Sequence, residues 1–267
     1  MRLRGRVLAI GGSDCSGGAG IQADIKSVLA MGGHAMTAIT AITVQDTRAV
    51  RAVVAQPAAQ VAAEVACVLA DPGADAVKTG MLANAAIIEA VAPLLSDAGL
   101  PLVVDPVLVS SSGHELLDVA GVGALRALLG QAALVTPNAP EAAVLSGVMV
   151  ADIGGMRRAA AALLRAGAGA VLVKGGHLAG EVVTDLLVTP AGEMPFRHRR
   201  AVSRHTHGTG CTLAAAIAAG LAQGMGLAAA VTRAVAYVQR AIAEAPGLGA
   251  GAGPLNHAAL WVADSLM

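Results

Sequence analysis

The sequence predicts an α/β protein in which a central, mostly parallel sheet lies between layers of helices. Segments that favour strands alternate with segments that favour helices along almost the whole chain. The strand segments are continuously apolar and do not alternate with polar residues, which indicates strands buried on both faces. No linker, tandem repeat or break in composition divides the 267 residues, so we expect one domain spanning residues 1–267.

The first half of the chain contains four short apolar segments typical of buried strands, at residues 7–10, 38–44, 76–78 and 102–104. An edge strand is expected at residues 50–55. A loop at 11–20 leads into the first expected helix, at 19–31, whose apolar residues share one face. Further helices are expected from Pro57 to Leu69, from Asn84 onward and after the polar loop 110–114.

The second half continues the same alternation. Strands are expected at 134–135 and 171–173, and a hairpin is expected from residues 182–188 and 193–198. Helices are expected around Glu141, at 156–165, from about Gly208 to Gln223, at 227–243 and after Asn256. A glycine-rich turn at 247–253 precedes the last of these helices.

The composition excludes several classes of protein. Hydrophobic residues make up 55% of the chain and charged residues 13%, which is the balance of a folded protein. The formal net charge is zero, and the chain has one Phe, one Tyr and one Trp, so we expect no nucleic-acid partner. No apolar run has transmembrane length, and Asp14 arrives too soon after residues 7–10 for a signal peptide, so we expect no membrane partner.

Cysteine and histidine spacing gives no metal or disulfide framework. The three cysteines, Cys15, Cys67 and Cys211, are odd in number and far apart, which favours a reducing, cytoplasmic location. His205 and His207 would suit a metal, but no third ligand follows at a matching spacing.

A glycine-rich stretch at residues 204–212 runs directly into an expected helix. The unpaired amides of a helix N-terminus bind anions, phosphate above all, so Gly208, Thr209 and Gly210 are candidates for a phosphate cradle. A cysteine at this position holds its thiolate form more easily than elsewhere, so Cys211 is a candidate base. The alternative is a glycine turn that caps a buried helix, with Cys211 as a small core residue.

Polar residues follow most of the expected strands. In open α/β sheets, ligands bind beyond the carboxyl ends of the strands, and several polar residues fall there: Ser13, Asp14, Gln45, Lys78, Thr79, Asp105, Asn138 and Lys174. Asp105 and Glu141 are candidates for the magnesium ion that a nucleotide carries, which takes one or two carboxylates. Alternatively, Asp105 caps the turn before Pro106, and Glu141 lies in a first helical turn. Lys174, followed by two glycines, would let a phosphate approach closely, or is an ordinary surface lysine.

Residues 18–23 match the G-x-G-x-x-A pattern of dinucleotide-binding folds. The loop that begins at Gly11 is longer than the tight turn of those folds. Ser13-Asp14 also crowds a negative charge into the place where a pyrophosphate would lie. The dinucleotide interpretation therefore depends on this motif alone.

Eight segments in order resemble the hydroxymethylpyrimidine/phosphomethylpyrimidine kinases of thiamine biosynthesis, which belong to the ribokinase-like superfamily. These segments lie at residues 12–24, 43–47, 78–81, 104–107, 136–138 with Glu141, 173–177, 205–212 and 253–257. The resemblance covers the chain from Val7 to about His257. It implies a three-layer α/β/α ribokinase-like fold, a homodimer, and ATP-dependent phosphorylation of a hydroxymethyl group and then of the monophosphate.

The resemblance also implies roles for the candidate residues. Cys211 replaces the aspartate base of the related sugar kinases, and the amides from Gly208 to Cys211 would hold the γ-phosphoryl oxygens. ATP would contact Asn138, Lys174 and Thr209, and magnesium (Mg2+) would be organised by Asp105 and Glu141. Gln45, with one donor and one acceptor, would pair with the edge of the aminopyrimidine substrate. The walls of the substrate pocket would be Asp14, Asp24, Val44, Met81 and Val107.

The chain shows two small departures from the family pattern: Cys15 replaces a usual serine, and Asp46 stands where asparagine is common. Asp46 follows the expected pyrimidine contact, Gln45, so it leaves the substrate preference slightly open. The main alternative is a pyridoxal kinase of the same superfamily. A dinucleotide-dependent oxidoreductase is a distant alternative, and a non-catalytic ligand sensor is opposed by the presence of Cys211, Asp105 and Lys174.

Overall fold

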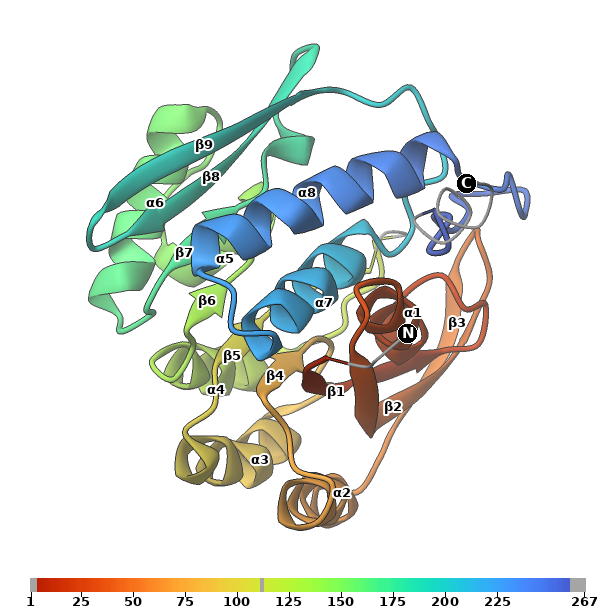
Figure 1. Ribbon diagram of the computed structural model, residues 1–267, viewed down its shortest axis with the longest axis vertical. Helices are drawn as coiled ribbons and strands as arrows, with labels where there is room; N and C mark the ends of the chain where they lie inside the picture. The colour runs from red at the N-terminus through yellow and green to blue at the C-terminus, as the bar shows by residue number, and fades with distance from the viewer. Residues whose placement is uncertain (1–3, 111–112, 260–267) are drawn as a thin grey trace.

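The structure, a computed structural model, describes residues 4–110 and 113–259. Within these ranges the chain forms one nine-stranded sheet and eight α-helices, arranged in three layers (Figure 1). The strands are β1 (Arg6–Asp14), β2 (His34–Gln45), β3 (Val50–Ala55), β4 (Ala76–Thr79), β5 (Leu102–Val104), β6 (Leu134–Val135), β7 (Val171–Val173), β8 (Val182–Thr189) and β9 (Gly192–Arg199). The helices are α1 (Gly20–Ala30), α2 (Ala58–Ala70), α3 (Ala85–Ala98), α4 (Val119–Leu129), α5 (Ala139–Ser146), α6 (Ile153–Arg165), α7 (Thr209–Ala222) and α8 (Leu227–Ala243), with a short 3-10 helix η1 (Gly175–His177).

The sheet has the strand order β3-β2-β1-β4-β5-β6-β7-β8-β9. Strands β2, β1, β4, β5, β6 and β7 pair in parallel, while β3 at one edge and β8 and β9 at the other pair antiparallel. The predicted α/β class, the mostly parallel sheet and the edge strand at 50–55 are therefore confirmed. The carboxyl ends of the parallel strands all lie at the same edge of the sheet, where the predicted polar residues can meet.

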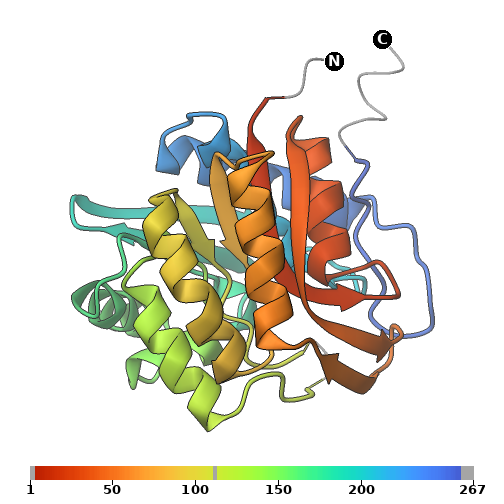
Figure 2. The same cartoon turned by 90° about the horizontal axis from the view of Figure 1, so that it is seen from below.

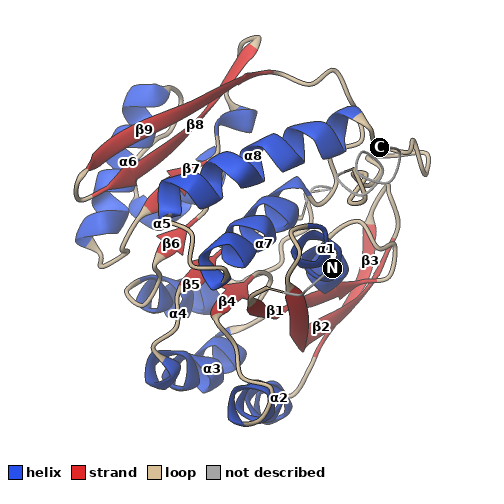
Figure 3. Cartoon of the chain, viewed as in Figure 1, coloured by secondary structure: helices blue, strands red, loops and turns tan. Residues whose placement is uncertain are grey.

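Each face of the sheet carries its own apolar core. Helices α1, α7 and α8 cover one face, and α2, α3 and α4 lie side by side across the other (Figure 2). Helix α7 is the most deeply enclosed of these, because every residue from Thr212 to Gly220 is buried. Because one sheet joins both halves of the described chain, we infer that it acts as a single domain (Figure 3).

Two boundaries differ from the sequence prediction for identifiable reasons. Residues 11–14, expected in a loop, extend β1, because they continue its pairing with β2 across a bulge between Gly11 and Ser13. Helix α6 begins at Ile153, before the expected residue 156, because the Asp152 side chain accepts a hydrogen bond from the Gly155 amide (2.6 Å) and caps the helix there.

The expected last helix falls mainly on residues 260–267, which lie outside the described residues; residues 257–259 form a turn. None of the helices in the described ranges has both the length and the apolar character needed to cross a bilayer.

Candidate active site

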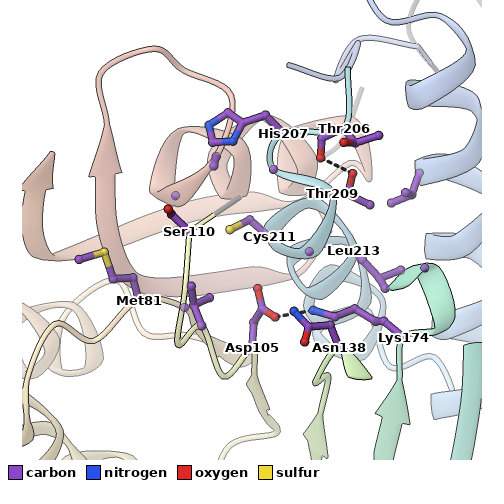
Figure 4. A pocket seen from close by; sticks show the side chains of 18 of the residues that line it. Met81, Asp105, Ser110, Asn138, Lys174, Thr206, His207, Thr209, Cys211 and Leu213 are labelled. Atoms are coloured by element: carbon purple, nitrogen blue, oxygen red, sulfur yellow. Dashed lines mark hydrogen bonds and ion pairs between the residues drawn. The ribbon is translucent and has the colours of Figure 1, made fainter. Parts of the chain in front are cut away.

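A cavity of about 610 Å³ lies at the carboxyl ends of the parallel strands (Figure 4). It brings together almost all the candidate residues, although they come from segments spread along the chain from β1 to α7. The candidates that line it are Asp14, Asp24, Gln45, Met81, Asp105, Val107, Asn138, Glu141, Lys174, Gly208, Thr209, Gly210 and Cys211. Because one space is lined by so many polar groups from different strands, it is the candidate active site.

Val44 is the candidate that does not line this cavity. Successive side chains of a strand point to opposite faces, so Thr43 and Gln45 face the cavity while Val44, 52% exposed, points away. The expectation that Val44 walls the substrate pocket is therefore wrong. Asp46, the departure from the family pattern, also lies outside the lining, because its carboxylate binds the Arg48 amide and the Arg51 guanidinium (2.8 and 2.6 Å).

The glycine turn before α7 has the geometry of a phosphate cradle. Gly208 has a φ of +84°, and a Cβ at this position would overlap the carbonyl oxygen of Gly18, so only glycine fits. The Thr209 amide and hydroxyl both donate to the Thr206 carbonyl oxygen, at 3.3 and 2.7 Å. Since the amide of Thr209 is already engaged, Gly210 and Cys211 are the better placed of the first-turn donors for an anion.

Cys211 differs from the sequence expectation in its ionisation. Its sulfur points into the cavity in Figure 4, but protein surrounds most of the side chain. This burial raises the pKa of the thiol to about 11, although the Lys78 ammonium and a hydrogen bond from the Gly20 amide both act to lower it. The expectation that the helix N-terminus favours the thiolate is therefore wrong for this protein without its ligands, because desolvation outweighs the nearby positive charge.

The ammonium of Lys174 lies between two carboxylates at the floor of the cavity. Its Nζ atom is 2.9 Å from Asp105 Oδ1 and 3.9 Å from Glu141 Oε2. A Cβ on Gly210 would lie 3.1 Å from this Nζ atom and 3.4 Å from Asp105 Oδ2, so the first turn of α7 packs directly against the ion pair. The anion cradle and the charged cluster thus form one site.

Asn138 and Glu141 also serve the structure of α5. The Asn138 side chain accepts from the Glu141 amide, and Glu141 Oε2 accepts from the Asn138 amide, both at 2.8 Å, which makes a reciprocal cap. The interpretation of Glu141 as a first-turn residue is therefore confirmed. Burial raises the pKa of Glu141 to about 7, despite the attraction of Lys174.

The acidic pair still fits magnesium carried by a nucleotide. Asp105 and Glu141 both line the cavity on either side of Lys174, and such an ion takes only one or two carboxylates besides water and phosphate oxygens. In the ranges that the structure describes, no three His, Cys, Asp or Glu side chains are arranged so that they could hold a metal ion. His205 and His207 therefore belong to no such group there.

An ion pair that sequence reasoning missed lies behind Cys211. Lys78 is the last but one residue of β4 and is fully buried, and its Nζ atom is 2.9 Å from both carboxylate oxygens of Asp24 on α1. Burial raises the pKa of Asp24 to about 6, against the attraction of Lys78. The signal was present in the sequence, because a lysine inside a strand that is buried on both faces requires a buried carboxylate partner.

The end of β1 and the glycine turn are joined by a second missed contact. His207 Nε2 lies 2.9 Å from Asp14 Oδ2, and the same carboxylate accepts the amides of Gly18 and Ala19 at 3.1 and 2.8 Å. Burial acts to raise the pKa of Asp14, but hydrogen bonds from His207, Ser16, Gln45 and Ala19 hold it well below its usual range. Because Asp14 occupies the amides that a pyrophosphate would need, the geometry argues against the dinucleotide interpretation.

The far end of the cavity contains residues that no motif indicated. Asp185 on β8 accepts a hydrogen bond from the Gly175 amide (2.8 Å) and lies 3.5 Å from His198 Nε2 on β9. Gln239 on α8 approaches the same histidine nitrogen at 3.4 Å. These side chains also line the cavity, and β8 and β9 lie on the opposite side of the sheet from β2, which carries Gln45.

Comparison with known proteins shows that the chain is similar to phosphomethylpyrimidine and pyridoxal kinases. The family model described as phosphomethylpyrimidine kinase matches residues 14–256. The hydroxymethylpyrimidine/phosphomethylpyrimidine kinase of Streptomyces coelicolor is 48% identical over 94% of this chain and 93% of its own length.

Two solved structures share the fold over nearly the same length. An ADP complex of Bacillus subtilis pyridoxal kinase has a TM-score of 0.89 at 34% identity and covers 97% of this chain and 99% of its own. A phosphomethylpyrimidine kinase of Clostridium difficile has a TM-score of 0.80 at 37% identity and covers 89% and 99%. The ribokinase-like fold that the resemblance implied is therefore confirmed.

Proposed function

The chain belongs to the phosphomethylpyrimidine kinase family, and from this premise we propose which reaction it catalyses and which residues carry it. It phosphorylates 4-amino-5-hydroxymethyl-2-methylpyrimidine with ATP, and then phosphorylates the monophosphate, on the route to thiamine diphosphate. The observation that carries the assignment is the convergence, in one cavity, of Gln45, the Lys174–Asp105 pair and the cradle that ends in Cys211.

The phosphoryl end of the site works mainly by positioning and by neutralising charge. The amides of Gly210 and Cys211 bind oxygens of the transferred group, and Lys174 binds the phosphates. In the free protein Lys174 contacts Asp105 through a single close hydrogen bond, so its remaining donors are available to phosphate oxygens. Magnesium, when bound with ATP, would be held by Asp105, with Glu141 acting directly or through water, and would supply further neutralisation of phosphate charge.

Cys211 is the group that accepts the hydroxymethyl proton as the new O–P bond forms. A thiol whose pKa is about 11 is mostly protonated at neutral pH, but its deprotonated form is a correspondingly strong base. This assignment predicts activity that increases with pH through the neutral range.

The substrate end of the site recognises the pyrimidine edge. Gln45 ends the strand β2 and hydrogen-bonds toward Asp14, which fixes the direction of its amide. Met81 and Val107 supply apolar contacts to the ring. Asp24 shapes this end as the buried partner of Lys78, so its carboxylate acts through that ion pair.

Pyridoxal is the second candidate substrate. The specific observation in its favour is the higher TM-score with a pyridoxal kinase (0.89) than with a phosphomethylpyrimidine kinase (0.80). Identity to the Streptomyces kinase (48%) exceeds identity to the pyridoxal kinase (34%), and we therefore place the pyrimidine first.

The decisive experiment measures ADP release with hydroxymethylpyrimidine, its monophosphate and pyridoxal, side by side and at saturating magnesium. We expect the highest kcat/KM with the pyrimidine and measurable turnover of the monophosphate. A higher kcat/KM with pyridoxal would reverse the assignment, and ADP release with none of the three would remove it.

We also propose that the reaction requires magnesium, that the protein forms a homodimer and that it is located in the cytoplasm. Asp105→Ala and Glu141→Ala should each raise the magnesium concentration needed for half-maximal activity, and unchanged titrations would leave both carboxylates purely structural. Sedimentation equilibrium of the purified protein tests the dimer.

A further inference from the structure

The C-terminal motif at residues 253–257 and the glycine-rich turn before it have no role in the mechanism above. We call residues 247–257 the C-terminal strap. It follows α8 and lies against the turn between β2 and β3; in Figure 2 it is the blue segment near the end of this brown hairpin. Its contacts reach both ends of the cavity.

At the substrate end, the strap contacts the turn that follows Gln45. The Gly251 amide donates to Thr47 Oγ1 at 3.1 Å. A Cβ on Gly251 would overlap the Thr47 carbonyl oxygen, and a Cβ on Gly249 would overlap the Thr47 side chain. The strap therefore lies against Thr47 as closely as backbone can, and glycine at both positions makes this approach possible.

At the phosphoryl end, the strap contacts the cradle on two sides. The His207 amide donates to the Gly253 carbonyl oxygen at 3.1 Å, and His207 forms a parallel bridge with Pro254. His257 Nε2 lies 3.0 Å from Thr212 Oγ1, and Thr212, in the first turn of α7, is fully buried. The strap thus holds the residue before Gly208 and the residue after Cys211.

The end of the strap is itself anchored on the core. Tyr237 donates its hydroxyl to the His257 carbonyl oxygen (2.8 Å), and the Asn256 amide donates to the Ala241 carbonyl oxygen (3.0 Å), both on α8. Leu255 is 3% exposed and belongs to the core that α7 and α8 share. Burial lowers the pKa of His257 to about 4, so the ring contacts Thr212 as a neutral group.

We propose that the C-terminal strap is a positioning element that fixes the spacing between the Gln45 turn and the first turn of α7. Given the proposed function, this spacing sets the distance from the substrate hydroxymethyl group to the transferred phosphoryl group. A misplacement of roughly 1 Å between reacting groups costs on the order of 10²-fold in rate, so loosening the strap lowers kcat more than it weakens ATP binding.

The first test compares Gly251→Ala with Gly226→Ala. At Gly251 the new methyl group must displace Thr47, whereas at Gly226, with a φ of −63°, a Cβ meets nothing within 4 Å. We expect kcat to fall on the order of 10²-fold in Gly251→Ala, with the ATP KM within about twofold, and to stay at the parent value in Gly226→Ala. Equal kcat in both variants would overturn the proposal.

A gentler pair of variants covers the case in which Gly251→Ala fails to fold. Thr47→Val removes the hydroxyl that binds Gly251 while keeping the side-chain shape, and Thr47→Ser retains the hydroxyl. We expect Thr47→Val to lower kcat on the order of fivefold, which corresponds to one lost hydrogen bond, and Thr47→Ser to retain the parent kcat. The same loss in both variants would overturn the proposal.

Hydrogen exchange gives a readout that does not depend on which substrate is correct. In Thr47→Val, amide exchange should accelerate in a peptide covering residues 45–50 and also in one covering 207–213, because the strap links them. Acceleration in 45–50 alone would overturn the proposal even if the enzyme phosphorylates the pyrimidine. Failure of the parent protein to release ADP would instead refute the proposed function and leave this test intact.

Discussion

Two lysine–aspartate pairs lie near the carboxyl ends of the parallel strands, with the same 2.9 Å separation but different surroundings. The Lys78–Asp24 side chains are 1% and 0% exposed, whereas Lys174 is 14% exposed beside a 2% exposed Asp105. Lys78 contacts both oxygens of its partner, whereas Lys174 contacts one, as the dashed line in Figure 4 shows.

We infer that this difference separates a structural ion pair from one that can bind a ligand. The Lys78–Asp24 pair, which we call the sealed pair, borders the cavity but is shielded from solvent, and each side chain is the close partner of the other. The open pair has a second carboxylate, Glu141, at 3.9 Å and a free approach from the cavity, so a phosphate can replace part of its contacts. We propose that these incompletely satisfied contacts allow the Lys174 cluster to bind phosphate.

The thiol of Cys211 lies in the electrostatic field of both lysines. We expect substitution of this residue to have the largest effect on the rate of catalysis. Cys211→Ala should lower kcat by roughly 10²–10⁴-fold, the range for a general base, with Cys67→Ala on α2 as the control. Because the base must be deprotonated and its pKa is about 11, kcat/KM of the parent should rise from pH 7 to 9. Cys211→Asp should recover part of the activity and remove this rise, and a near-normal rate in Cys211→Ala would reject the base role.

Breaking the sealed pair, Lys78–Asp24, should lower the stability of the folded protein. Lys78→Met leaves Asp24 buried without its partner, which should cost about 3–5 kcal/mol in the free energy of unfolding, measured by urea denaturation. Adding Asp24→Leu should recover most of this loss, because the uncompensated charge is gone. If the double variant were no more stable than Lys78→Met alone, the two side chains would not act as a pair.

Breaking the open pair, Lys174–Asp105, should lower the rate of catalysis. Lys174→Met removes a positioned donor to phosphate and should lower kcat/KM for ATP by roughly 10²–10³-fold. The loss of stability should be clearly smaller than in Lys78→Met, because Asp105 borders the cavity. Equal destabilisation by the two lysine variants would contradict the distinction between sealed and open pairs.

Glu141 should produce the smallest effect, a pH dependence of stability. Burial raises its folded-state pKa from 4.5 to about 7, so the folded state binds this proton more tightly than the unfolded state. Its contribution to stability is therefore present below pH 4.5 and is lost as pH rises through 7. Glu141→Gln retains an acceptor for the α5 cap, so its stability relative to the parent should increase from pH 5 to 8 by about 1 kcal/mol or more. A constant difference between the two would contradict the raised pKa.

The sequence could predict whatever depends on local order along the chain. The cradle at residues 208–211, the strand-end positions of Gln45 and Lys174, and the edge strand at 50–55 all follow from neighbouring residues. The family resemblance places Val44 in the wall of the substrate pocket, whereas strand alternation turns its side chain away from the cavity.

The missed features depend on distant partners. His207 and Asp14 are 193 positions apart, and Gly251 and Thr47 are 204 apart, and no spacing rule connects them. The ionisation of Cys211 was predicted with the wrong sign because it depends on how much protein surrounds the thiol. Packing density of that kind is a property of the assembled layers and not of the nine-residue stretch at 204–212.

The burial of α7 has a consequence for how the chain folds during synthesis. The central strands β1, β2 and β4 lie within the first 79 residues, but the helices that cover most of one face of the sheet begin at Thr209. An emerging chain therefore exposes the apolar face around Val7, Val103 and Leu172 until its last fifth has left the ribosome. Long-range contacts of this kind slow folding and prolong exposure to aggregation, so maturation should depend strongly on chaperones that shield apolar surfaces.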